Sequence, residues 1–149
     1  MSNEREFWVI DDDTLYVREL LKALSEPLTG WETIKFITAG PVLAALEAGK
    51  RPAAVILDMM LARDEWDNPV DWPPDSNPAK NGIAIAEKLH ECGVRPEVIG
   101  VITAVIEKQH LEGLKKAEIL ERNILFKPVE VERIREMVRR MLLAAQPAK

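Results

Sequence analysis

The chain has 149 residues, of which 47% are hydrophobic and 30% charged, and its net charge is −5. These values are typical of one globular domain and exclude a disordered or membrane-embedded chain. The single cysteine, Cys92, excludes an internal disulfide, and two histidines argue against a histidine-rich metal site. The acidic charge argues against nucleic-acid binding, and no apolar run suits a membrane span or signal peptide, so we expect a cytoplasmic protein.

Segments typical of strands and helices alternate five times along the chain. Short apolar or alternating runs predict strands at residues 7–10, 33–38, 53–57, 98–102 and 124–126. Helical spacing of apolar residues follows each of them, at residues 14–24, 41–48, 83–89, 107–117 and 131–144. Because continuous apolar strands are buried on both faces, the pattern predicts a single α/β domain over residues 1–149, with a parallel sheet between two helical layers.

The segment between Asp58 and Asn81 interrupts this alternation. It has about 22 residues, whereas connections in α/β units usually have about 2–6. It carries four prolines, five acidic residues and two of the four tryptophans, Trp66 and Trp72. Tryptophan is poorly suited to open solvent and is a favoured interface anchor, so these rings either pack back on the domain or contact a partner. In both cases the segment begins beside Asp58 and should influence access to it.

Polar side chains stand at the carboxyl ends of four predicted strands. They are three acids after the first strand, an acid after the third, a threonine ending the fourth and a lysine after the fifth: Asp11, Asp12, Asp13, Asp58, Thr103 and Lys127. Ligands of open parallel sheets bind at the carboxyl ends of the strands. We therefore expect these groups, although far apart in sequence, to lie around one site.

The chemistry of this set favours phosphoryl transfer. Two carboxylates about 4 Å apart repel by about 4 kcal/mol at an effective dielectric of about 20, which indicates a divalent cation. Mg²⁺ typically binds one or two carboxylates and keeps several waters. With Mg²⁺, the Thr103 hydroxyl and the Lys127 ammonium beside it, Asp58 is the predicted nucleophile that forms an acyl phosphate.

Four sequence blocks resemble the signature blocks of the response-regulator receiver domain of the CheY-like superfamily. They are residues 9–13 (VIDDD), 55–60 (VILDMM), 101–104 (VITA) and 126–128 (FKP). The resemblance covers nearly the whole chain, and the blocks occur in order on the expected elements. It implies a (βα)5 doubly wound, flavodoxin-like fold with a five-stranded parallel sheet in the order 2-1-3-4-5.

The resemblance also implies a role for each site residue. Asp58 would be the phosphoacceptor. The metal ligands would be Asp11, Asp12, Asp58 and the main-chain carbonyl of Met60. The phosphoryl group would be bound by Thr103, Ala104 and Lys127, with a cis bond between Lys127 and Pro128. Asp13 lies beyond the matching acidic pair and is expected to cap the following helix.

The resemblance implies a signalling protein rather than an enzyme, with at most self-phosphorylation from small donors and autodephosphorylation. A histidine kinase or phosphotransfer protein would supply the phosphoryl group. Few residues follow the last predicted helix, so we expect a stand-alone receiver that acts through a downstream protein of unknown identity. Pairing with a second copy of the chain is left open.

The sequence departs from the family pattern at three places. The nearest equivalent of the usual Asp–Gly pair is Asn81–Gly82, which makes residues 62–80 an insertion. The proline that often follows the phosphoacceptor is absent. Ile124 occupies the position of an aromatic residue that usually moves with the threonine on activation, so the usual conformational relay is in question.

Two other functions fit part of the pattern. A Mg²⁺-dependent phosphohydrolase of the haloacid dehalogenase type would use Asp11, Asp13, Thr103 and Lys127, but it needs a further acidic pair ending a strand after the lysine. A receiver-like scaffold that is never phosphorylated would have its chemistry blocked by the long segment. The intact set of polar strand ends argues against this scaffold function.

Overall fold

The structure is a computed structural model that describes residues 5–61, 79–104 and 107–146. Trp66 and Trp72, with most of the predicted insertion, lie outside the described residues. The strands are β1 (Glu6–Ile10), β2 (Glu32–Phe36), β3 (Ala54–Leu57), β4 (Ile99–Thr103) and β5 (Ile124–Phe126). The helices are α1 (Thr14–Ala23), α2 (Ala39–Glu47), α3 (Ala79–Glu91), α4 (Lys108–Lys116) and α5 (Val131–Ala145), with short 3-10 helices at Pro96–Val98 and Glu121–Asn123.

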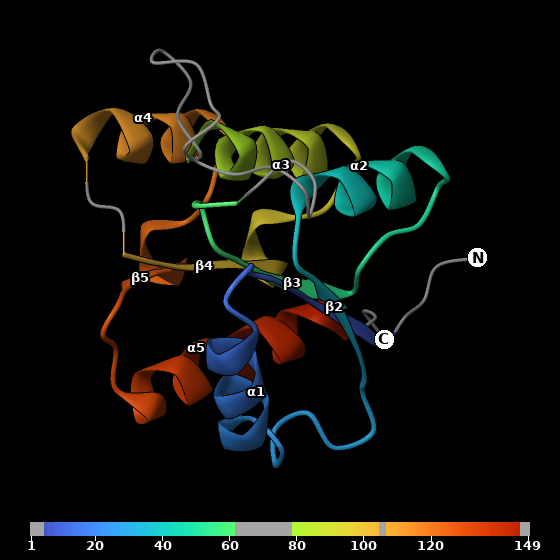
Figure 1. Ribbon diagram of the computed structural model, residues 1–149. Helices are drawn as coiled ribbons and strands as arrows, with labels where there is room; N and C mark the ends of the chain where they lie inside the picture. Colours follow the sequence, from blue (N-terminus) through green and yellow to red (C-terminus); the bar gives the residue numbers. More distant parts are fainter. Residues whose placement is uncertain (1–4, 62–78, 105–106, 147–149) are drawn as a thin grey trace.

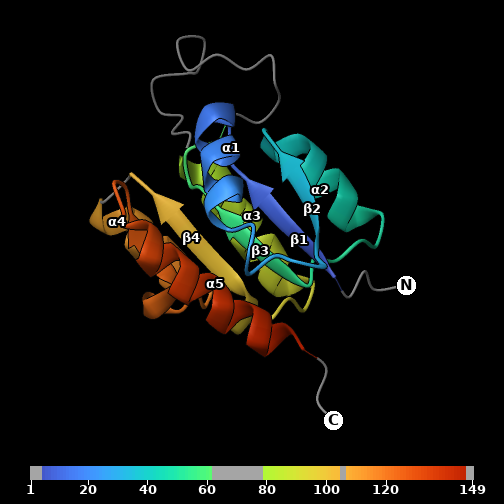
Figure 2. The same cartoon turned by 90° about the horizontal axis from the view of Figure 1, so that it is seen from below.

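The five strands form one parallel sheet in the order β2-β1-β3-β4-β5. Helices α1 and α5 cover one face, and α2, α3 and α4 cover the other (Figures 1 and 2). The three central strands are enclosed between these layers, and β3 and β4 are buried along their whole length. The predicted fold and strand order are confirmed.

The core lies between the sheet and its two helical layers. On the α5 side, Met137 and Met141 are fully buried against Gly100 of β4, where a Cβ atom would lie 2.9 Å from each of their side chains. On β1, Trp8 is 1% exposed and meets Phe36 of β2 edge to face. Close packing of this kind requires small residues where a helix lies directly on a strand.

Helices α2 and α3 begin earlier than the sequence predicts, at Ala39 and Ala79, whereas α1 and α5 begin at the predicted residues. Helix α3 begins at Ala79 rather than near residue 83, so the Asn81–Gly82 pair lies inside its first turn.

Leu15 and Val131 continue the apolar stripes of α1 and α5, yet they are 63% and 43% exposed. Both lie in the first turn of their helix, where periodicity alone does not show whether the sheet reaches that far. Within the described residues, no helix is long and apolar enough to cross a membrane.

Candidate functional site

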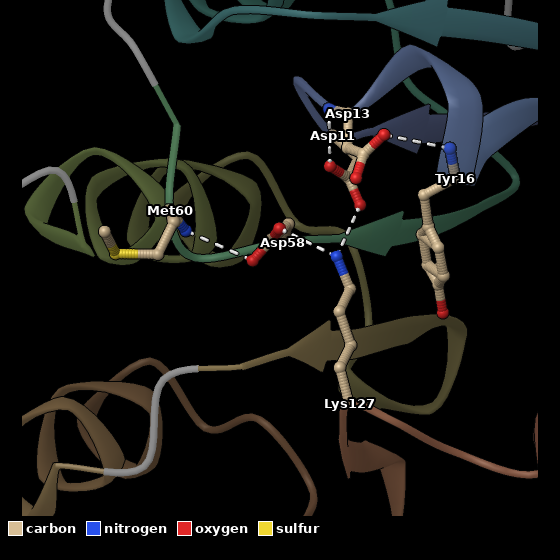
Figure 3. A network of polar contacts seen from close by, with 6 residues as sticks. All are labelled: Asp11, Asp13, Tyr16, Asp58, Met60 and Lys127. Carbon is tan, nitrogen blue, oxygen red and sulfur yellow. Dashed lines mark hydrogen bonds and ion pairs between the residues drawn. The ribbon is translucent and has the colours of Figure 1, made fainter. Parts of the chain in front are cut away.

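The carboxyl ends of β1, β3 and β5 bring Asp11, Asp58 and Lys127 into contact (Figure 3). Parallel pairing fixes the backbone at these ends: the Asp58 N–H donates to the Ile10 carbonyl at 2.9 Å, and the Lys127 N–H donates to the Thr103 carbonyl at 2.9 Å. The predicted cis bond between Lys127 and Pro128 is present. Residues from distant parts of the chain therefore meet because their strands are neighbours in the sheet.

Lys127 bridges two buried carboxylates. Its Nζ atom lies 3.1 Å from Oδ2 of Asp11 and 3.1 Å from Oδ2 of Asp58. The side chains of these acids are 5% and 8% exposed. Burial alone would lower the pKa of Lys127, but the charges of Asp58 and Asp11 and the hydrogen bonds to them outweigh it, so the pKa lies above its usual value. The site thus contains a permanent ammonium group between two acids.

Asp11, Asp12 and Asp58 form an acidic cluster, in which one carboxylate oxygen of each lies within 4.8 Å of the others. Burial raises the pKa of Asp11 to about 6; the hydrogen bond from the Asp13 N–H opposes this shift, and the charge of Asp58 adds to it. Burial and the charge of Asp58 also raise the pKa of Asp12. The raised pKa values show that ionising these carboxylates together is unfavourable. A hard divalent cation bound to their oxygens would offset this repulsion.

The segment after β3 is held close to this cluster. The Met60 N–H donates to Oδ1 of Asp58 at 3.2 Å, and the Asn81 side chain donates to the Leu61 carbonyl at 2.7 Å. A Cβ atom on Gly82 would lie 2.3 Å from the Cα atom of Met59, so only glycine fits at this contact. Asn81 and Gly82 therefore connect the start of α3 to the residues that follow Asp58.

Helix α1 contributes two side chains next to the cluster. Asp13 caps the helix, since its Oδ1 atom accepts a hydrogen bond from the Tyr16 N–H at 2.9 Å, as predicted. The Asp13 N–H in turn donates to Oδ1 of Asp11 at 2.9 Å. Tyr16 is not among the predicted site residues, yet its ring centroid lies 4.2 Å from Nζ of Lys127. Its position three residues after the capping acid was the available signal.

The remaining predicted site residues lie on or beside β4 and β5. Thr103 is fully buried at the end of β4, and Ala104 is exposed immediately after it. Ile124 pairs with Val101 across the sheet and is partly buried. It lines a groove of 360 Å³ between α4, β5 and α5 together with Leu111 and Phe126. An aliphatic side chain therefore occupies the predicted relay position.

The sequence matches no family model and no curated protein significantly. The structure, by contrast, is similar to many solved structures. A CheY-like response regulator receiver domain protein from Methanospirillum hungatei JF-1 is 21% identical, with a TM-score of 0.67 over 95% of both chains. The chain has the fold of a receiver domain. The BeF3-activated DrrB receiver domain is 22% identical, with a TM-score of 0.63 over 96% of this chain and 99% of that one.

A third structure with the receiver fold is a response regulator protein from Burkholderia pseudomallei. It is 19% identical, with a TM-score of 0.61, and the match covers 94% of this chain and 69% of the other. That protein was solved with a phosphorylated aspartic acid, a calcium ion and citrate. The resemblance first indicated by the four sequence blocks is thus confirmed for the fold.

Proposed function

We propose that this chain is a receiver of two-component phosphorelay signalling, phosphorylated on Asp58 by a histidine kinase or phosphotransfer protein. The observation that carries the proposal is the contact of Lys127 with Asp11 and Asp58 at the strand ends, beside Asp12. The Burkholderia structure, with its phosphorylated aspartic acid and calcium ion, supports it. We further propose that the phosphorylated chain acts through contacts with other proteins.

In the proposed reaction, a carboxylate oxygen of Asp58 attacks the phosphorus of a phosphohistidine or of acetyl phosphate. The new O–P bond forms while the bond to the imidazole nitrogen or to the acetate oxygen breaks, and the leaving group keeps the bonding electrons. The product is an acyl phosphate on Asp58. The Met60 N–H already donates to Oδ1 of Asp58, which fixes the orientation of the carboxylate.

Lys127 supplies the positive charge that this step needs. Its ammonium lies 3.1 Å from Oδ2 of Asp58, so it is next to the place where the phosphoryl oxygens would arrive. Preorganised charge of this kind stabilises the charge that develops on the equatorial oxygens. Thr103 and Ala104, at the neighbouring strand end, are the proposed hydroxyl and main-chain partners of the same oxygens.

Asp11, Asp12, Asp58 and the Met60 carbonyl are the proposed ligands of Mg²⁺. The acidic cluster fits a divalent cation because burial and mutual repulsion raise the pKa of two of its members. When bound, Mg²⁺ would neutralise negative charge on the carboxylates and on the transferred group.

The contacts of Asp13 argue against a phosphohydrolase of the haloacid dehalogenase type. That enzyme would use the carboxylate of Asp13 in its reaction, whereas here it accepts a hydrogen bond from the Tyr16 N–H as the cap of α1. The intact contacts among Asp11, Asp58 and Lys127 argue against a scaffold without phosphorylation chemistry.

The proposal is tested by incubating the protein with acetyl phosphate, with and without Mg²⁺, and following the intact mass. We expect a Mg²⁺-dependent gain of one phosphoryl group that hydroxylamine removes and that is lost in Asp58→Asn. Asp13→Asn is the matched control, because asparagine caps a helix as well as aspartate and this residue lies outside the cluster. A gain that persists in Asp58→Asn, or no gain in the unaltered protein, would contradict the proposal.

A further inference from the structure

Tyr16 packs against the ammonium of Lys127. It belongs to α1, whereas the residues of the acidic cluster follow β1 and β3. The ring centroid lies 4.2 Å from Nζ, within the distance of a cation–π interaction. Figure 3 shows the ring standing beside the Lys127 side chain, which reaches past it to the two carboxylates. The ammonium therefore has Asp11 and Asp58 as hydrogen-bond acceptors and an aromatic ring as a further neighbour.

The position of the ring is linked to the acidic cluster by a closed series of contacts. Asp11 accepts from the Asp13 N–H through Oδ1, and Asp13 accepts from the Tyr16 N–H through its own Oδ1. The Tyr16 ring contacts Nζ of Lys127, and Nζ donates to Oδ2 of Asp11. Both carboxylate oxygens of Asp11 thus accept hydrogen bonds in this series. The cap at Asp13 fixes the backbone of Tyr16 in a position from which its ring contacts Lys127.

The ring is a neutral neighbour of the ammonium. Burial raises the pKa of Tyr16, and the charges of Asp11 and Asp58 add to this effect against the opposing charge of Lys127, so the phenol keeps its proton near neutral pH. A neutral aromatic face attracts the ammonium but does not replace Asp11 or Asp58 as the acceptor of its hydrogen bonds, as a third carboxylate could. Tyr16 is half-buried at the edge of the core.

A lysine side chain is long and flexible, so holding its ammonium in one place has an entropic cost. We propose that Tyr16 is a positioning residue, whose ring face holds the Lys127 ammonium beside Asp58 before the phosphoryl group arrives. This role rests on the proposed phosphorylation of Asp58. It predicts that a ring at position 16 speeds formation of the acyl phosphate, and that the Tyr16 hydroxyl is dispensable.

The test compares Tyr16→Leu, which removes the ring, with Tyr16→Phe, which keeps it; Tyr16→Met is a second ring-less variant. The first measurement is the NMR shift of the Lys127 ε-methylene protons, which a nearby ring face moves upfield. The second is the rate of acyl-phosphate formation from acetyl phosphate at saturating Mg²⁺, per folded protein by circular dichroism. We expect the leucine and methionine variants to lose the upfield shift and react about 3- to 10-fold more slowly, as a cation–π contact of ordinary strength implies.

The phenylalanine variant should keep the shift and react within about twofold of the unaltered protein, as the dispensable hydroxyl implies. An unaltered rate in both ring-less variants would overturn the positioning role and leave the proposed function intact. A phenylalanine variant as slow as leucine would also overturn it. No acyl phosphate on the unaltered protein would overturn the proposed function, and this role with it, even if the ring-current shift were present.

Discussion

Ionisation of Asp11 should destabilise the metal-free protein. Its pKa is about 6 in the folded chain against an ordinary value of 3.8, mainly because it is buried. Between these two pH values the folded chain binds more protons than the unfolded chain, so the free energy of unfolding falls as the pH rises. This decrease begins near pH 3.8 and is complete once the pH exceeds about 6. The difference between the two pKa values corresponds to about 3 kcal/mol of stability.

The contribution of Asp11 can be isolated by comparing the unaltered protein with Asp11→Asn in urea, in the presence of a chelator. The variant cannot ionise at this position. The contact of its amide with Lys127 changes the free energy of unfolding by an amount that does not depend on pH. We therefore expect the difference in free energy of unfolding between the variant and the unaltered protein to increase by about 2.4 kcal/mol between pH about 4 and about 7.5, because the unfolded carboxyl group is already partly ionised at pH about 4.

Adding Mg²⁺ provides the second arm of this experiment. A cation bound by the ionised cluster should restore stability to the unaltered protein above pH about 6, and have less effect on Asp11→Asn. If the two proteins keep a constant difference across this pH range, Asp11 ionises with an ordinary pKa and the argument from burial is refuted.

Three further predictions concern residues that stabilise the fold, each measured by urea unfolding. Gly82→Ala should lower the free energy of unfolding by about 2 kcal/mol, because its Cβ would overlap the Met59 backbone. The control is Gly113→Ala, whose Cβ would meet the Ile83 side chain rather than backbone, and which should change the free energy of unfolding by less than about 1 kcal/mol. Equal losses would contradict this reasoning. Arg51→Met should cost about 1–3 kcal/mol, since the guanidinium donates to carbonyls at the ends of both α2 and α3; an unchanged midpoint would show these bonds to be dispensable. Asp13→Ala should cost about 1 kcal/mol and Asp13→Asn almost nothing, and a similar loss in both would show that the charge rather than the cap matters.

The arrangement of the fold and the main site residues could be predicted from the sequence. Continuous apolar runs that end in a polar residue are sufficient to place Asp58 and Lys127 at the same edge of a parallel sheet, although 69 positions separate them. The structure confirms this contact, and the cap formed by Asp13 follows from its place before a helical pattern. The roles of all the site residues stay predictions, from Asp58 as phosphoacceptor to the Met60 carbonyl as a metal ligand.

The contacts that the sequence did not predict depend on how helices meet the strand ends. The Tyr16 ring reaches Lys127 only because α1 begins at Thr14 in one orientation, which apolar periodicity does not define. The approach of Gly82 to Met59 joins two segments across the long connection, where no pattern indicates the distance. Such contacts require the relative placement of elements, whereas spacing along the chain describes each element separately.

Locating the modified residue tests the central proposal most directly. After reaction with acetyl phosphate and Mg²⁺, the acyl phosphate is reduced with borohydride and the altered aspartate is identified by tandem mass spectrometry of the peptides. The account predicts modification of Asp58 alone, because Asp11, which contacts the same Lys127 ammonium and also accepts a main-chain N–H, is assigned to the metal and not to the phosphoryl group. Modification of Asp11 in place of Asp58, or of neither residue, would contradict it.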